Sequence, residues 1–219
     1  MTVSSGTASP SLAEHAYRTL TDQLVTLQIR PGSPLNDEQL ARQLGVGRTP
    51  VREALKRLEA DRLVVAYPRR GTFATEVHLT DLGHVSEVRR QLEPLAAAAA
   101  ARRASAGDRE LLAGLAESAA EQSSRPAVEP VELMRLDLRL HRAVYAATGN
   151  PFLESTLISY DNLATRIWCL FLDRLPGLAG HVGEHSALLR AVIDGDAERA
   201  AACATDHVTG FEAAIRAVL

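Results

Sequence analysis

The sequence is poor in aromatic residues and lacks any long apolar run. Aromatic side chains make up only 4% of the 219 positions, which disfavours a strand-rich core, and abundant alanine and leucine favour helices. No apolar run approaches the ~20 residues of a membrane-spanning helix. The N-terminus lacks both the charged and the apolar segment of a secretory signal. We therefore expect a helical, cytoplasmic protein without a membrane partner, with a disordered leader over residues 1–11.

Cysteine is also scarce, and the charge is unevenly distributed. Cys169 and Cys203 lie in helical patterns without C-x-x-C spacing, which predicts reduced thiols instead of a disulfide scaffold. Residues 1–80 hold ten basic and eight acidic residues, and the remainder holds fourteen and nineteen. Within residues 40–71 the balance is eight basic against three acidic. A basic region joined to an acidic one indicates nucleic-acid contact at one end.

The first third of the chain has the pattern of a winged helix-turn-helix. Apolar spacing predicts a helix over 12–29 that ends at Pro31 and Gly32. Asn36 or Asp37 can cap a short second helix that ends at Gly45, and a third helix follows R-T-P. Two β-prone runs around P-R-R-G then predict a small hairpin. We expect this domain to span residues 12–78.

In a helix-turn-helix, the N-terminal residues of the second helix of the motif meet base edges. Here that segment carries Arg48, Thr49 and Arg52, whose side chains can bind guanine, phosphate or a thymine methyl group. At the tip of the hairpin, Arg69, Arg70 and Gly71 can approach a phosphate or the minor groove. The alternative is a solvated basic face, and the predicted hairpin favours DNA binding over it.

Residues 79–219 show no convincing strand, and their patterns predict an antiparallel all-α bundle of six to seven helices. The first helix of this bundle contains Pro94, so we expect a kink or break near Glu93. Asp196 is placed to cap the last helix.

Several histidines in this half occupy helical positions that suit a metal site. Asp137 and His141 are four residues apart, so they share a helix face. His185 and His207 are in phase with apolar residues, which places them on buried faces, whereas His181 lies near a helix start and favours the surface. For each residue alone, a surface pair or a hydrogen-bonded core histidine is the alternative.

The first 77 residues carry motifs in a characteristic order: P-G, L-A-R-Q-L-G-V, R-T-P-V-R-E-A-L and R-G-T-F. Over about residues 12–77 the chain resembles the DNA-binding domain of the GntR family of bacterial transcription regulators. The resemblance implies that Arg48, Thr49 and Arg52 contact operator DNA, with Gly71 at the wing. Two residues depart from the pattern: Glu38 replaces a frequent arginine, and Gly47 replaces the usual serine.

Residues 80–208 carry E-V-R-R-Q-L-E-P-L-A-A, D-L-R-L-H, T-G-N-P, E-H-S-A-L-L-R-A-V-I-D-G-D and D-H-V. In this order they resemble the FCD effector-binding domain of one GntR subgroup. The resemblance implies a metal bound by Asp137, His141, His185 and His207. These ligands suit a borderline divalent ion, Zn²⁺ first, with Ni²⁺, Fe²⁺ and Mn²⁺ as alternatives.

The resemblance also implies a pocket for a small organic acid beside the metal. Arg89 occupies the motif arginine and is the first candidate for binding the carboxylate, with Asn150 and Arg166 as further candidates. The alternative for Arg89 is a surface salt bridge with Glu93. The alternative for Arg166 is a side chain that extends to solvent beside Trp168.

These features predict a homodimeric regulator, typically a repressor, that binds a pseudo-palindromic operator and responds to an organic-acid effector. Two other hypotheses stay open from the residues alone. One is a metal-dependent enzyme such as a hydrolase, although no general base is recognisable and an enzyme would not need the basic head. The other is a metal that only stabilises the bundle.

Overall fold

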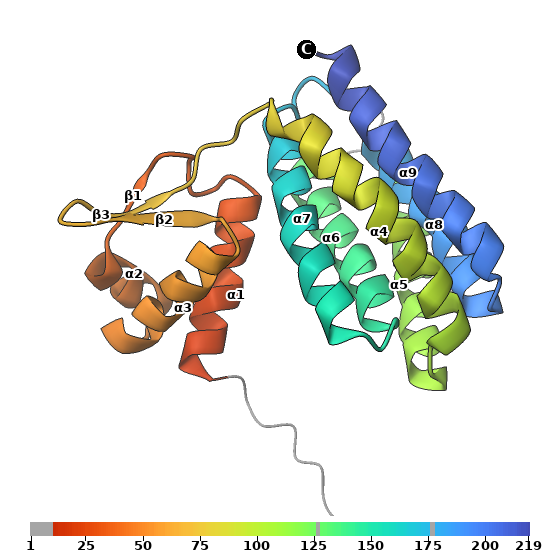
Figure 1. Ribbon diagram of the computed structural model, residues 1–219, viewed down its shortest axis with the longest axis horizontal. Helices are drawn as coiled ribbons and strands as arrows, with labels where there is room; N and C mark the ends of the chain where they lie inside the picture. Colours follow the sequence, from red (N-terminus) through yellow and green to blue (C-terminus); the bar gives the residue numbers. More distant parts are fainter. Residues whose placement is uncertain (1–10, 126–127, 176–177) are drawn as a thin grey trace, which may run out of the picture. The chain divides into compact units, whose positions relative to one another are not determined.

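The computed structural model describes residues 11–125, 128–175 and 178–219. Apart from Ser11, the leader predicted before Leu12 lies outside these residues. The chain divides into two compact units, the first ending at Glu76 and the second beginning at Val77. A winged helix-turn-helix forms the first unit and a helical bundle the second, which confirms the predicted fold class (Figure 1).

Three helices form the body of the first unit: α1 (Leu12–Val25), α2 (Asp37–Leu44) and α3 (Arg48–Ala60). Helix α1 is shorter than the predicted 12–29. Both the amide and the hydroxyl of Thr26 bond to the carbonyl of Asp22, and Leu27 takes a φ of 58°, which a continuing helix does not allow. Apolar side chains from α1 and α3 form the core, with Leu20, Leu24 and Leu58 fully buried.

The helix-turn-helix is fixed by local capping, as predicted. The side chain of Asn36 accepts hydrogen bonds from the amides of Glu38 and Gln39, both at 3.0 Å, and so begins α2. Gly45 ends α2 with a φ of 66°, a left-handed conformation that glycine adopts without strain. Gly47 is the N-cap residue of α3, and no side-chain hydrogen bond caps the first amides of this helix.

The wing is a three-stranded antiparallel sheet in the order β1-β3-β2, with β1 (Pro34–Leu35), β2 (Val64–Tyr67) and β3 (Gly71–Ala74). The predicted hairpin is β2–β3. Strand β1 was not predicted, and it pairs Pro34 with Phe73. Its short, proline-containing sequence gives a weak strand signal, and its position depends on Gly32 and Ser33, which exchange backbone hydrogen bonds with Ala74.

In the described residues the second unit contains six helices: α4 (Asp81–Arg103), α5 (Ala106–Ser124), α6 (Pro130–Ala146), α7 (Pro151–Cys169), α8 (Leu178–Asp194) and α9 (Ala197–Ala217). The side chain of Asp196 caps α9, as predicted. Of the kink or break expected near Glu93, the break is absent, since α4 continues through Pro94. A run of alanines follows Pro94, and an Arg89–Glu93 ion pair spans the preceding turn, so both sides favour helix.

Packing within the bundle brings distant segments together. Helix α4 lies along α9, α5 packs against α8, and α6 packs against α7 (Figure 1). Buried alanines on α4 allow its neighbours to approach closely, and leucines of α5, α6 and α8 fill the core between the helices. None of the helices within residues 11–125, 128–175 and 178–219 combines the length and the hydropathy of a membrane span.

Candidate metal centre and nucleic-acid interface

Four predicted ligands meet inside the bundle. Asp137 and His141 project from the same face of α6, His185 comes from α8 and His207 from α9. All four side chains are buried. The Nε2 atom of His141 lies 3.2 Å from Nε2 of His207 and 3.2 Å from Nε2 of His185. The Asp137 carboxylate lies 3.9 Å from the ring of His141 and 3.7 Å from that of His185.

The polar atoms of this cluster do not satisfy one another by hydrogen bonding alone. Asp137 Oδ1 and His185 Nδ1 are buried without a hydrogen-bond partner in the described residues. Such orphaned groups are rare in folded proteins, because each costs free energy to remove from water. A divalent cation binds carboxylate oxygens and imidazole lone pairs at once, so these residues fit a metal.

The electrostatics of the cluster prepare two of the imidazoles for coordination. Burial and nearby positive charge lower the pKa of His185 to about 3 and hold that of His207 well below its usual value. Burial also acts to lower the pKa of His141, but the Asp161 and Glu93 carboxylates outweigh it and raise this pKa to about 9.

Two glutamates orient the histidines, and sequence reasoning missed both in this role. The Glu93 carboxylate lies 3.4 Å from Nδ1 of His141, and the Glu184 carboxylate 3.3 Å from Nδ1 of His207. A carboxylate that accepts the Nδ1 proton leaves the Nε2 lone pair for a metal. The Tyr145 hydroxyl also lies 3.0 Å from Nδ1 of His141. The sequence signal for this third contact was the four-residue spacing between His141 and Tyr145.

The predicted Arg89–Glu93 pair forms, but it is buried instead of exposed. Arg89 Nε donates to the Glu93 carboxylate at 2.5 Å, and Arg89 Nη2 lies 3.5 Å from the Asp161 carboxylate. Glu93 thus connects Arg89 to His141. Burial penalises the charge on Arg89, but the two carboxylates outweigh that penalty and raise its pKa.

A small cavity of about 10 Å³ adjoins the four predicted ligands. That volume is close to the minimum that holds one water molecule. It is lined by Arg89, Met134, Asp137, Asp161, Thr165, Trp168, His181, His207 and Phe211. Of the three predicted effector residues, only Arg89 lines it.

The other two predicted effector residues have different surroundings. Asn150 accepts hydrogen bonds from the amides of Phe152 and Leu153 and so caps α7. Arg166 is 1% exposed, so its side chain does not extend to solvent beside Trp168. The surface position expected for His181 is also wrong. Its side chain is only 10% exposed because its ring stacks between those of Trp168 and His207.

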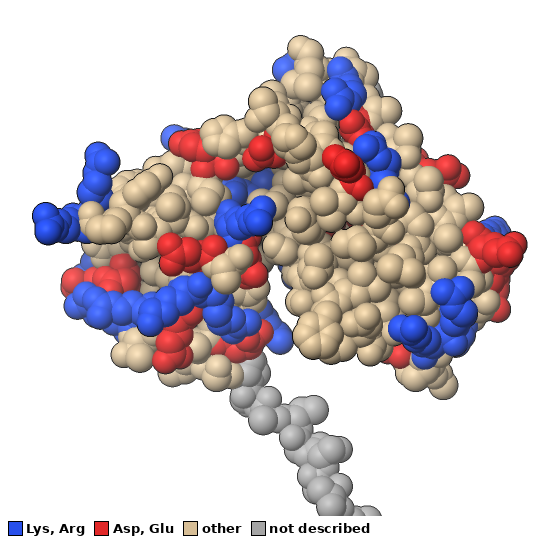
Figure 2. Space-filling view, viewed as in Figure 1, with Lys and Arg blue, Asp and Glu red and all other residues tan. Residues whose placement is uncertain are grey.

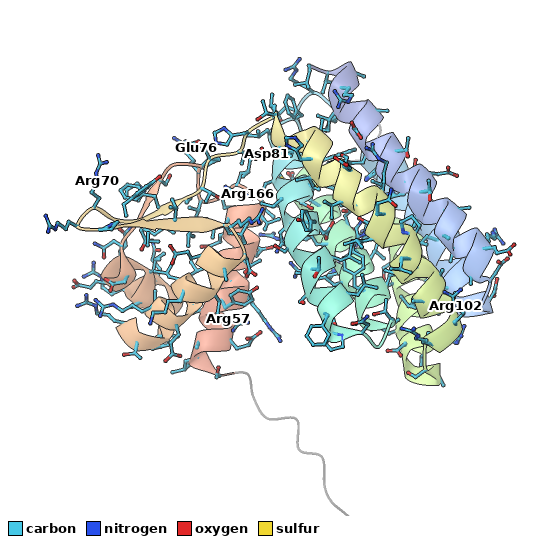
Figure 3. The ribbon with its side chains drawn as sticks, viewed as in Figure 1. Arg57, Arg70, Glu76, Asp81, Arg102 and Arg166 are labelled. Carbon is cyan, nitrogen blue, oxygen red and sulfur yellow. The ribbon has the colours of Figure 1, made fainter. Side chains whose placement is uncertain are left out.

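The predicted DNA-contacting residues lie on the surface of the first unit. Arg48 and Thr49 lie in the first turn of α3 and Arg52 begins the next turn, and all three are exposed. Arg70 extends from the tip of the β2–β3 hairpin (Figure 3). Its neighbours Arg69 and Gly71 have φ values of 64° and 97°, which form the tight turn. On the face shown, basic side chains gather at this tip and over α2 and α3, with acidic ones between them (Figure 2).

An open groove of about 440 Å³ lies beside α3 in the first unit. Arg52 and Lys56 of α3 line one side, and Gly71 and Thr72 of β3 line another. A winged helix-turn-helix with exposed arginines at the start of its second motif helix and a basic wing defines a DNA-binding protein.

Comparison of the sequence with models of known protein families agrees with that class. Residues 12–74 match the model of the bacterial regulatory proteins of the gntR family, and residues 84–210 match that of the FCD domain. The chain belongs to the GntR family of transcription regulators and carries an FCD domain. Members of this family are regulators of transcription and not enzymes, so the enzyme hypothesis is set aside.

Individual proteins that are similar to this chain share a moderate sequence identity with it. The chain is 33% identical over 135 residues to the Nta operon transcriptional regulator of Aminobacter aminovorans, covering 62% of this chain and 63% of the relative. It is 29% identical over 208 residues to the galactonate operon transcriptional repressor of Escherichia coli, covering 84% and 89%. The solved structure of E. coli McbR/YncC shares the fold, with a TM-score of 0.80, 23% identity and coverage of 94% and 98%.

Proposed function

We propose that this regulator is a repressor whose operator affinity is controlled by a small organic acid bound beside a divalent metal ion. The observation that carries the proposal is the buried convergence of Asp137, His141, His185 and His207, with Arg89 on the adjoining cavity. The name of the E. coli relative, a repressor of an operon for galactonate, a sugar acid, supports both parts.

Asp137, His141, His185 and His207 would hold the metal, Zn²⁺ being the ion that best suits three imidazoles and one carboxylate. Ni²⁺, Fe²⁺ and Mn²⁺ accept the same ligands. When bound, the ion supplies a positive charge that attracts a carboxylate. Glu93 and Glu184 keep the Nε2 lone pairs of their histidines directed inward, and Asp137 contributes the negative charge.

Arg89 is the residue of the chain that would bind the carboxylate of the effector. Its contacts to Glu93 and Asp161 use Nε and Nη2, and a guanidinium carries five N–H donors, so donors remain for a ligand. A cavity of about 10 Å³ does not hold an organic acid. The acid must therefore displace lining side chains such as His181. That displacement would change the packing of the helices that carry these side chains.

At the other unit, Arg48, Thr49 and Arg52 would contact base edges and phosphates, while Arg69, Arg70 and Gly71 would contact the backbone or minor groove. Two copies of the chain would read the two halves of a pseudo-palindrome. The exposed apolar side chains Leu95 and Phe152, on the packed helices α4 and α7, favour this face of the bundle for dimerisation. The surface of the bundle shown in Figure 2 includes a broad area free of charged side chains.

The test begins with selection of duplex DNA from a random-sequence library by the purified chain at a stated salt concentration. We expect a pseudo-palindromic sequence to be enriched. Gel shifts with that duplex and a panel of hydroxy- and dicarboxylic acids should then show one acid that releases the DNA, and a chelator should abolish the release. An acid that acts equally well after chelation would contradict the metal-linked pocket. A chelator that melts the bundle, with no response to any acid, would identify a structural metal.

A further inference from the structure

The two arginines predicted to read DNA share one intramolecular partner. The Asp37 carboxylate accepts a hydrogen bond from Arg52 Nε at 2.6 Å, and both of its oxygens lie 3.2 Å from Arg48 Nη2. Asp37 is the first residue of α2, so the contact joins the two helices of the helix-turn-helix. Its side chain is 22% exposed, against 54% and 62% for Arg48 and Arg52.

This contact holds two like charges together. Arg48 and Arg52 lie on successive turns of α3, and without a counter-charge their guanidinium groups would repel each other and spread. The guanidiniums of Arg48 and Arg52 lower the pKa of the Asp37 carboxyl, so it stays ionised at neutral pH. It engages only one nitrogen of each guanidinium, which leaves further N–H donors for a base edge.

A carboxylate at this place has two effects on DNA binding. It orders two long side chains before binding, which reduces the entropy lost when they reach their bases. It also repels phosphates, which weakens the sequence-independent attraction that dominates non-specific binding. The first effect favours a specific site over random DNA, whereas the second weakens binding to both because both carry the same phosphates.

We propose that Asp37 is a specificity-determining positioning residue: it aligns Arg48 and Arg52 for base recognition. The proposal rests on DNA recognition by these two arginines. It adds a residue of α2 that contacts the reading side chains without needing to contact a base itself.

The test compares Asp37→Asn with Glu38→Gln. Glu38 is the neighbouring acid in the same first turn of α2, and its ion pair is with Arg42 at 3.5 Å. The two variants lose the same charge and the same helix-dipole interaction, but only Asp37→Asn releases the reading arginines. The probes are the duplex enriched by the wild-type chain and a scrambled duplex of equal length and composition, at one salt concentration.

We expect Asp37→Asn to lower the ratio of specific to scrambled affinity by about tenfold, as the cost of ordering two arginine side chains indicates. Glu38→Gln should strengthen binding to both duplexes and leave the ratio unchanged. In an Arg52→Ala background, Asp37→Asn should change the ratio much less, because Asp37 then has only Arg48 left to position. Thermal unfolding of each variant establishes that it is folded.

If Asp37→Asn and Glu38→Gln change the ratio equally, Asp37 acts only through its charge and the proposal is wrong. An effect of Asp37→Asn that is undiminished in the Arg52→Ala background would overturn the positioning role as well. If the wild-type chain enriches no duplex at all, it is the DNA-recognition proposal itself that fails.

Discussion

Each unit of this chain places arginine beside carboxylate, but in opposite surroundings. In the first unit, Arg48 and Arg52 meet Asp37 on the surface, and both arginines are more than half exposed. In the second, Arg89 meets Glu93 and Asp161 with all three side chains almost fully buried. An exposed pair can exchange its partner for a phosphate or a base at little cost, whereas a buried pair fixes a geometry.

The exposed arginine–carboxylate pairs of the first unit and the buried pairs of the second therefore have different roles. The surface pairs contribute little to the stability of the fold and remain available to DNA. The buried network holds His141 and, through it, the proposed metal ligands in one arrangement.

His185→Ala should abolish metal binding, because it removes one of four converging ligands and no other histidine occupies its position. After incubation with Zn²⁺ and gel filtration, we expect metal analysis to find bound zinc in the wild-type chain and none in the variant. His84→Ala, which changes an exposed histidine of α4, is the matched control and should retain zinc. Retention of zinc by His185→Ala would exclude this residue as a ligand.

Glu93→Gln should affect stability far more than Asp37→Asn. Removing one partner of a buried pair leaves Arg89 undercompensated and should lower the free energy of unfolding by about 3–5 kcal/mol. Asp37→Asn should change it by less than about 1 kcal/mol, because its ion pairs are exposed. Urea titration followed by the fluorescence of Trp168, the single tryptophan, reports on the second unit, and circular dichroism reports on both.

The same Glu93→Gln variant should bind Zn²⁺ about 10–100-fold more weakly, because the Nδ1 proton of His141 loses its charged acceptor. Competition with a chelator of known affinity measures this change. Glu87→Gln, an exposed change on the same helix, should leave both stability and zinc affinity as they are. If Glu93→Gln changed stability but not zinc affinity, its role would be packing alone.

A smaller effect than that of Glu93→Gln is expected at a half-buried contact in the first unit. The Tyr17 hydroxyl donates to Asp61 at 2.7 Å, and the Arg57 guanidinium lies over the Tyr17 ring (Figure 3 labels Arg57). Tyr17→Phe should cost about 1 kcal/mol at neutral pH, the typical contribution of one hydrogen bond. Hydrogen exchange of α1 and α3 amides measures it without interference from the bundle.

This contact also predicts a pH dependence. Burial and the hydrogen bond to Asp61 raise the pKa of Tyr17 to about 12. The unfolded chain releases this proton near pH 10, before the folded chain does, so the contribution is complete below about pH 10 and is lost as the pH rises toward 12. The difference between wild-type and Tyr17→Phe should therefore shrink over that interval. A constant difference would contradict the assigned protonation.

The sequence alone determined features that depend on neighbours a few residues apart. Asn36 and Gly45 fixed α2 through capping and a left-handed turn, and the four-residue spacing of Asp137 and His141 placed both on one face of α6. The basic start of α3 and the turn after β2 were likewise evident, because periodicity and turn chemistry are local. The short strand β1 and the continuity of α4 at Pro94 were not.

Only the tertiary structure decided which side chains meet across helices. Asp37 contacts arginines eleven and fifteen positions later, and Glu93 contacts both Arg89 and His141, forty-eight positions away. These contacts depend on how each helix rotates and packs, which periodicity restricts to a face but not to a partner. The same packing stacked His181 against Trp168. The sequence thus determined the set of charged and candidate metal-ligating groups, and packing determined which of them lie close together.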